Sequence, residues 1–488
     1  MKVIERAKFD SCYPLTINAI ERIRGQNMAQ VDIAIRGGRI VSGGEEMQAD
    51  LAISGGVIVQ IGGEFEAERD IDAHQMLILP GVIDAHVHLT QSGGDSNRKH
   101  KWVDDFTSGT SAALAGGVTT VGNMTFIRPG ELPLEALERE GALAREQAIS
   151  DVFLHPVFGE TTAEALAQIP QLLDSGCNTI KYFMSMPRFD AQAEGYLEAT
   201  RLAGENHLLT MIHCEDYPLL TAATNRLVNA GHLSLRHYPE SRPVISEVVA
   251  TQRAVAFAEA TGAPVYVVHL SSERSLEVCA EAQSRGVPVY VETRPFYLHL
   301  TRERFELDDG PKYVGQPPLR EQHDVDAIWA GIRQGTVNTV CTDHAPWSLA
   351  AKMDDDHTIA NLRPGAENLQ VMLPMLHSEG VLKGRISLSR MVEVLTTNEA
   401  KLFGLYPRKG AIAVGSDADV VVFDPNLTRT ITASMLKSNA DHSVYEGWEV
   451  TGWPLLTLRR GEIVFQDDEV IGAAGSGQIV QREATMQL

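Results

Sequence analysis

The sequence Leu79-Pro80-Gly81-Val82-Ile83-Asp84-Ala85-His86-Val87-His88-Leu89 decides how the rest of the chain is interpreted. Its apolar run leads directly into two histidines one residue apart. This pattern is typical of the place where a buried strand ends and the following loop begins. Side chains at i and i+2 of a strand point to the same side, so His86 and His88 can face one metal ion. An isolated pair of this kind is more often core packing than a ligand pair. The pair therefore matters only if other strands end in further ligands.

The middle of the chain alternates buried-strand runs with helical stretches, which is the pattern of βα units around a parallel sheet. Helical patterns span, for example, residues 163–175 and 246–261. We expect strands at residues 82–86, 118–123, 152–157, 178–183, 208–213, 265–269, 287–292 and 337–342. These runs match the eight strands of a (β/α)8 barrel, so the sequence predicts an α/β fold of the TIM-barrel type.

Side chains that can do chemistry gather at the ends of these predicted strands. In a (β/α)8 barrel the active site lies at the carboxyl ends of the strands. The candidates at that rim are His86 and His88 after the first strand, Lys181 on the fourth, His213 ending the fifth, His269 ending the sixth and Asp343 just after the eighth. Taken singly, His213 and His269 are more readily explained as core histidines. The alternative for Lys181 is an interior ion pair. Randomly placed histidines have no reason to prefer one edge, so together they indicate a site.

Lys181 needs a separate explanation, because an ammonium group would be repelled by metal cations. A lysine buried in a strand has a lowered pKa and can be neutral. A neutral amine can take up carbon dioxide to form a carbamate, whose two oxygens can bridge two metals. His344, which follows Asp343, is interpreted as a hydrogen-bonding group beside the site.

Short strand-like runs broken by glycine pairs occupy residues 31–71. Similar strand-like runs occur again at residues 419–424 and 456–465. Such runs are typical of small antiparallel β units. Neither piece has enough apolar surface alone, so we expect one smaller β-sandwich domain built from both ends of the chain. The predicted division is an N-terminal extension (1–27), the two parts of the β domain (28–79 and 405–470), the catalytic barrel (80–404) and a C-terminal tail (471–488).

The composition restricts the partners and the location of the protein. The 488 residues carry a formal net charge of −22, which argues against nucleic acid or an anionic membrane surface as a partner. The 5 cysteines are scattered and form no CxxC pair, which indicates free thiols in a reducing compartment. No apolar run approaches the roughly 20 residues needed to cross a bilayer, and residues 1–27 lack the apolar region of a signal peptide. We expect a cytoplasmic protein.

The motifs resemble those of the amidohydrolase superfamily, and within it the dihydropyrimidinase and hydantoinase group of cyclic amidases. The resemblance extends over roughly residues 31–464. It rests on Pro80-Gly81-Val82-Ile83-Asp84-Ala85-His86-Val87-His88, Ile180-Lys181-Tyr182-Phe183-Met184, Ile212-His213-Cys214-Glu215, Val268-His269-Leu270-Ser271, Pro317-Pro318-Leu319-Arg320 and Thr342-Asp343-His344-Ala345-Pro346. It continues in Pro364-Gly365-Ala366-Glu367-Asn368, Lys401-Leu402-Phe403-Gly404-Leu405-Tyr406-Pro407-Arg408-Lys409-Gly410 and Gly415-Ser416-Asp417-Ala418-Asp419.

The resemblance implies a binuclear metal site and a hydrolytic reaction. The implied ligands are His86, His88 and Asp343 for one divalent metal, His213 and His269 for the other, and an N6-carboxylated Lys181 with a hydroxide as the bridge. Zinc is the default metal for such ligands, although manganese, cobalt or iron suit similar geometry. Asp343 would take the proton of the attacking hydroxide and pass it to the leaving ring nitrogen. The product would be an N-carbamoyl amino acid from a hydantoin or dihydropyrimidine, and the resemblance also implies a homotetramer.

The substrate pocket departs from the family pattern. Hydantoinases usually carry a ring-binding tyrosine two residues after the Lys-x-Phe-Met segment, where this chain has Met186, and a thioether cannot donate a hydrogen bond. Gln316 stands where the family usually has serine before Pro317, and its amide both donates and accepts. Asn368 follows Glu367 as in the family and would bind the ring, although from sequence alone it is as readily a loop-capping residue.

Other functions stay open. An allantoinase, or another ureide or cyclic imide hydrolase, would use the same metals with a different ring pocket. A dihydroorotase is disfavoured, because Thr90 stands where those enzymes typically have an arginine. A non-catalytic relative, which keeps this fold as an assembly scaffold, would have lost metal ligands, whereas all the ligand positions are filled here.

Overall fold

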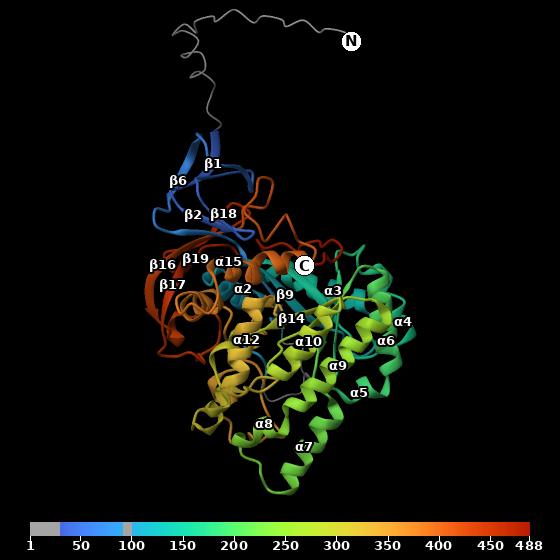
Figure 1. Cartoon of the computed structure of the whole chain (residues 1–488). Helices are drawn as coiled ribbons and strands as arrows, with labels where there is room; N and C mark the ends of the chain where they lie inside the picture. Colours follow the sequence, from blue (N-terminus) through green and yellow to red (C-terminus); the bar gives the residue numbers. More distant parts are fainter. Residues whose placement is uncertain (1–29, 91–99) are drawn as a thin grey trace, which may run out of the picture.

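The structure, a computed structural model, describes residues 30–90 and 100–488. Its centre is an eight-stranded parallel sheet with the strands in chain order, around which helices are wrapped (Figure 1). The strands are β8 (Val82–Val87), β9 (Val118–Phe126), β10 (Asp151–Val157), β11 (Thr179–Phe183), β12 (Leu209–His213), β13 (Val265–Val267), β14 (Val289–Thr293) and β15 (Thr339–Val340). The His88 N–H donates a hydrogen bond of 2.8 Å to the His344 carbonyl, which closes the barrel between its first and last strands. The predicted (β/α)8 barrel is confirmed, whereas the extension predicted at residues 1–27 lies outside the described residues.

Every residue of β8, β10 and β12 is buried, because helices cover the outside of the barrel and side chains fill its inside. The predicted ends of the sixth and eighth strands are wrong, since β13 stops at Val267 and β15 at Val340. His269 and Asp343 have φ angles of 39° and 49°, left-handed conformations that cannot continue a strand. The backbone therefore leaves the parallel sheet before it reaches these two predicted ligands.

Helices follow most strands, as βα units require. The helix predicted at residues 163–175 is wrong in extent, because α4 ends early and the next turn contains Pro170, which has no N–H to donate. The helix predicted at 246–261 is confirmed as α9. The α-helices are α2 (Phe106–Ala115), α3 (Pro133–Gln147), α4 (Ala163–Leu166), α5 (Pro187–Ala191), α6 (Ala193–Glu205), α7 (Tyr217–Asn229), α8 (Tyr238–Ser241), α9 (Val244–Thr261), α10 (Glu273–Ser284), α11 (Pro295–His299), α12 (Gln322–Gln334), α13 (Leu349–Lys352), α14 (Met372–Met375), α15 (Leu388–Val392) and α16 (Asn398–Leu402). The 3₁₀ and π segments are η2 (Ile169–Gln171), η3 (Leu235–His237), η4 (Arg302–Glu306), η5 (Gly310–Tyr313), η6 (Leu376–Val381), η7 (Glu393–Thr397) and η8 (Ala433–Met435).

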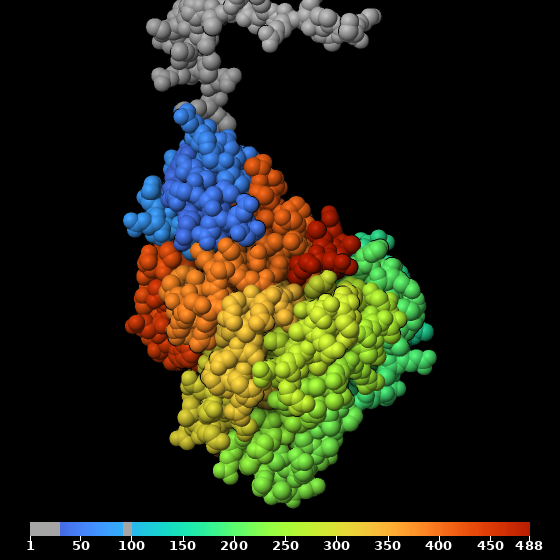
Figure 2. Space-filling model, in the orientation of Figure 1, coloured from blue at the N-terminus to red at the C-terminus, as the bar shows by residue number. Residues whose placement is uncertain are grey.

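Two further sheets form the smaller domain from both ends of the chain. Their strands are β1 (Gln30–Arg36), β2 (Arg39–Ser42), β3 (Glu45–Gln48), β4 (Leu51–Ser54), β5 (Val57–Ile61), β6 (Glu66–Asp72) and β7 (Leu77–Pro80) before the barrel, and β16 (Val420–Thr430), β17 (Glu449–Arg459), β18 (Glu462–Gln466) and β19 (Glu469–Val470) after it. β7 pairs with both β2 and β16, so one sheet contains both ends of the chain. Figure 2 shows the blue N-terminal segment packed directly on the orange C-terminal part. The predicted sandwich is confirmed, although the run at 456–465 is two strands that turn at Arg460 and Gly461.

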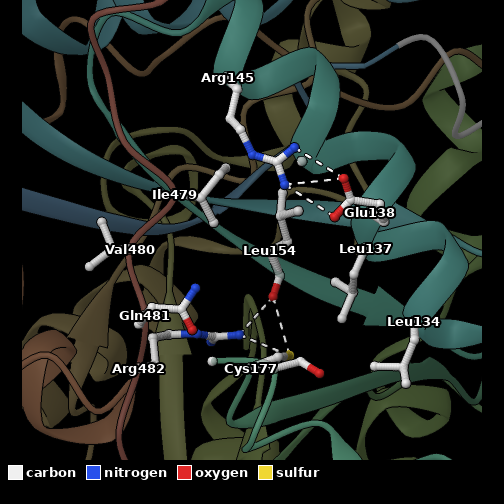
Figure 3. Close-up of a pocket in the computed structure, with 13 residues that line it drawn as sticks. Leu134, Leu137, Glu138, Arg145, Leu154, Cys177, Ile479, Val480, Gln481 and Arg482 are labelled. Carbon is white, nitrogen blue, oxygen red and sulfur yellow. Dashed lines mark hydrogen bonds and ion pairs between the residues drawn. The ribbon is translucent and has the colours of Figure 1, made fainter.

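The segment after β19 crosses the amino end of the barrel. Ile479 forms a bridge to β10, and Val480 packs into the barrel core. Arg482 is buried, and its guanidinium donates to the Leu154 carbonyl at 2.7 Å and contacts the Cys177 sulfur at 3.0 Å (Figure 3). These residues border a cavity of about 220 Å³ between α3 and the C-terminal segment. The segment therefore covers the end of the barrel that lies opposite the predicted site.

Within the ranges 30–90 and 100–488, no helix is both long and apolar enough to span a bilayer. The cysteines in these ranges, Cys177, Cys214, Cys279 and Cys341, are buried free thiols, as predicted. Cys12 lies outside the described residues.

Candidate metal centre

His86, His88 and Asp343 meet at the carboxyl rim of the barrel. Asp343 Oδ1 lies 3.0 Å from His88 Nε2 and 3.4 Å from His86 Nε2. One ligand atom from each of the three residues lies within 4.8 Å of the others, and no other group of three or more such residues occurs in the described part of the chain. Imidazole nitrogens and a carboxylate oxygen are suitable ligands for zinc and similar divalent metals.

His213 and His269 form a second pair of possible ligands beside the first group. His213 ends β12, and its Nδ1 lies 3.0 Å from Nε2 of His269. The centroids of the His269 and His86 rings are 5.5 Å apart, so the pair adjoins the first group. Burial lowers the pKa of His213 and holds that of His269 well below its ordinary value. Both imidazoles are therefore neutral near pH 7, which is the form that binds metals.

Two glutamates orient these histidines, and the sequence analysis assigned a role to neither. Glu292 in β14 accepts a hydrogen bond of 2.9 Å from His86 Nδ1 and one of 2.8 Å from the backbone N–H of His269. Glu215 accepts one of 2.8 Å from His213 Nε2. A carboxylate on the far nitrogen fixes the tautomer and leaves the near nitrogen with a lone pair for a metal. Because Glu292 ends a predicted strand, the rule that found the histidines could also have found this residue.

Arg242 holds Glu215 in place. The Arg242 Nε donates to Glu215 Oε1 at 2.9 Å. Burial alone would raise the pKa of Glu215, but Arg242 and His213 together lower it to about 2. The glutamate is thus ionised when it accepts the hydrogen bond from His213.

Lys181 is wholly buried in β11, and its Nζ has no hydrogen-bond partner among the described residues. Burial lowers its pKa to about 8, although the nearby charges of Glu292 and Asp343 act in the other direction. An amine with this pKa is partly neutral near neutral pH, and an unpartnered nitrogen is free to react. Lys181 therefore fits the carbamate that was predicted for it.

Asp343 and its neighbour His344 have different partners. Arg294 Nη1 donates to Asp343 Oδ2 at 2.7 Å. Burial alone would raise the pKa of Asp343, but Arg294 and two histidines hold it well below its ordinary value, so the carboxylate is ionised as a metal ligand must be. His344 Nε2 instead donates to Asp104 Oδ2 at 2.7 Å. His344 is thus a hydrogen-bonding group beside the site, as expected.

A cavity of about 500 Å³ opens onto the four histidines and Asp343. Aromatic side chains form part of its wall, with the Trp102 ring 4.8 Å from that of His88 and the Phe126 ring 6.3 Å from that of Phe183. The polar side chains that line it away from the histidines are Thr224, Tyr238, Ser241, Arg242 and Gln316. An apolar wall with a few polar groups is typical of a small-molecule site.

The residues predicted to contact substrate lie in different positions. Met186, which is 52% exposed, lines the cavity where α5 begins, and Gln316 also lines it. Asn368 is fully buried and does not line the cavity, and its Nδ2 donates to the Ala366 carbonyl at 3.2 Å. A ring-binding role for Asn368 stays a prediction.

Comparison with known proteins gives matches over most of the chain. The Amidohydrolase family pattern matches residues 77–464. The D-hydantoinase of Geobacillus stearothermophilus is 36% identical over 420 residues, which cover 84% of this chain and 88% of that protein. The solved structure of a D-hydantoinase from a Bacillus sp. AR9 is 34% identical with a TM-score of 0.88, covering 93% of this chain and 100% of that one. A dihydropyrimidinase from Brevibacillus agri NCHU1002 is 33% identical with a TM-score of 0.87, covering 93% and 99%.

Proposed function

Because the chain belongs to the amidohydrolase family, we propose that it is a metal-dependent hydrolase that opens a cyclic amide or ureide ring. Its relatives are named hydantoinases and dihydropyrimidinases, and they match nearly the whole of the described chain. The observation that most supports the proposal is the convergence of His86, His88 and Asp343 at the rim, with His213 and His269 beside them. A non-catalytic scaffold would have no need of buried histidines oriented by buried carboxylates.

The metal ligands of the proposal are the residues predicted from sequence. They are His86, His88 and Asp343 for one ion, His213 and His269 for the other, and a carboxylated Lys181 as the bridge. The donor set fits two zinc ions, because His213 and His269 are neutral and the Lys181 nitrogen is unpartnered among the described residues. When bound, such ions would supply an activated water near neutral pH and polarise the scissile carbonyl.

Asp343 is the residue placed to move a proton. It lines the cavity, so its carboxylate can accept the proton of the attacking water and deliver it to the ring nitrogen that leaves. Gln316 can both donate to and accept from a ring amide at the same cavity wall, whereas Met186 cannot donate. The aromatic side chains Trp102, Phe126 and Phe183 would give the ring an apolar wall.

The proposal is tested by assaying dihydrouracil, 5-substituted hydantoins, allantoin and dihydroorotate side by side. Release of an N-carbamoyl amino acid from a hydantoin or dihydropyrimidine would support it. Turnover of allantoin alone would favour the ureide alternative, and failure on every ring with metal bound would refute the substrate class. Asp343→Asn keeps the side-chain shape but removes both the base and the negative charge of a proposed metal ligand, so we expect a loss of activity of at least about 10²-fold.

We also propose that the enzyme is a cytoplasmic homotetramer. The buried free thiols support a reducing compartment. The tetramer rests on the resemblance to the hydantoinase group, and analytical ultracentrifugation of the purified protein tests it.

A further inference from the structure

Arg294 is a wholly buried arginine that the proposed reaction does not use. It directly follows β14, and its guanidinium carbon lies 4.9 Å from the Phe296 ring centroid and 5.4 Å from that of Tyr297. Within the described chain, its Nε and Nη2 have no hydrogen-bond partner. Burying a cation with unsatisfied N–H groups is unfavourable; the ion pair with Asp343 and the contacts with the two aromatic rings offset this cost.

That ion pair gives the two oxygens of Asp343 different surroundings. Oδ2 accepts the hydrogen bond of 2.7 Å from Arg294, while Oδ1 lies 3.0 Å from His88 Nε2 and 3.4 Å from His86 Nε2. Regular sheet pairing does not fix this carboxylate, because β15 is only 2 residues long and Asp343 has a φ of 49°. A guanidinium that binds one carboxylate oxygen also fixes the direction of the other.

We propose that Arg294 is a positioning residue, which holds Asp343 Oδ2 so that Oδ1 stays aimed at the metal shared with His86 and His88. The inference rests on the proposed function, since it requires a metal at these ligands. Arg294 does not line the cavity, so it acts through Asp343 and not on the substrate.

A positive charge near a metal site also has an opposing effect, because it repels the cation. The two effects predict opposite results when Arg294 is removed. If positioning dominates, a freed Asp343 binds the metal more weakly, since groups that orient metal ligands typically contribute about 10- to 100-fold to metal affinity or activity. If repulsion dominates, the metal binds more tightly.

The test compares two variants at this position. Arg294→Met has a similar length without charge or N–H groups, and Arg294→Lys keeps the charge and a donor. Arg482→Met is a matched control, because Arg482 is another buried arginine but lies at the opposite end of the barrel. Metal content is measured by mass spectrometry, affinity by competition with a chelator, and folding by thermal unfolding.

We expect Arg294→Met to bind one of its two metals about 10- to 100-fold more weakly. The variant should have a lower kcat and a KM close to that of the wild type. Arg294→Lys should recover part of the affinity, and Arg482→Met should keep the wild-type value. Unchanged or tighter binding in Arg294→Met refutes the inference while leaving the proposed function intact. A wild-type protein that binds no divalent metal refutes the proposed function instead. If Arg294→Met does not fold, Arg294→Ala with added guanidinium ion decides: restored metal affinity supports the inference, and no restoration refutes it.

Discussion

Replacing Glu292 tests whether carboxylates prepare the histidines for metal. This residue accepts hydrogen bonds from His86 Nδ1 and from the His269 N–H, so it touches a proposed ligand of each metal. Glu292→Gln keeps one acceptor oxygen but loses the charge, whereas Glu292→Ala removes both acceptors. The two variants therefore separate the charge of the carboxylate from its hydrogen bonds.

The expected losses follow from these contacts. Carboxylates that orient metal-binding histidines contribute about 10- to 100-fold to metal affinity, or about 1.4 to 2.8 kcal/mol. Glu292→Gln should lose metal affinity near the lower end of this range, because its remaining oxygen can still accept both hydrogen bonds. Glu292→Ala should reach the upper end, and it should also lower the free energy of unfolding by about 1 to 3 kcal/mol, because the buried His269 N–H loses its acceptor.

Metal content after dialysis against a series of chelator concentrations measures the affinity, and chemical denaturation measures the stability. Glu399→Gln is a matched control, because Glu399 is also buried but its Oε1 contacts the Cys341 sulfur at 3.0 Å and no histidine. This control should retain wild-type metal affinity. If Glu292→Ala holds both metals as tightly as the wild type, the argument that Glu292 orients the ligands is wrong.

Three further predictions concern the bridge, the metals and acid stability. Lys181→Ala should lose metal and activity, and undiminished metal content with full activity would rule out the bridging role. Removing metal with a chelator should lower the thermal midpoint, because a ligand of the folded state stabilises that state, and an unchanged midpoint would contradict metal binding at this centre. Burial lowers the pKa of His299 from 6.5 to about 3, so the unfolded chain takes up this proton first as the pH falls. Its contribution to stability is nearly complete at pH 7 and decreases by about 2 kcal/mol between pH 7 and 5, so in chemical denaturation His299→Gln should lose about 2 kcal/mol less than the wild type over this range.

The meeting of the proposed metal ligands at one rim could be predicted, because their positions depend on topology more than on exact strand ends. The carboxyl ends of parallel strands share one rim, so an error of a few residues leaves His269 and Asp343 at the correct edge. β13 and β15 are indeed shorter than predicted, yet the turns that follow them keep both side chains beside His86. Side chains on a shared rim are therefore recognisable from sequence even when strand boundaries are wrong.

Contacts between side chains on different loops could not be predicted in this way. Arg294 is the single residue between β14 and α11; arginines are mostly exposed, and nothing local shows that this one lies against a residue 49 positions away. Asn368 follows a family motif, but sequence adjacency does not determine where its side chain points. Within the predicted β region at residues 31–71, no apolar run marks β6, because its sequence is mostly charged; this strand pairs with β1 through backbone groups.

The hydrogen bond from His88 to His344 has a consequence for biosynthesis. It joins two segments whose ligands, His88 and Asp343, are separated by 255 positions. Until Asp343 has been synthesised, the proposed site formed by His86, His88 and Asp343 lacks its carboxylate. If these three residues bind a metal as proposed, we expect that site to form only after translation has passed Asp343.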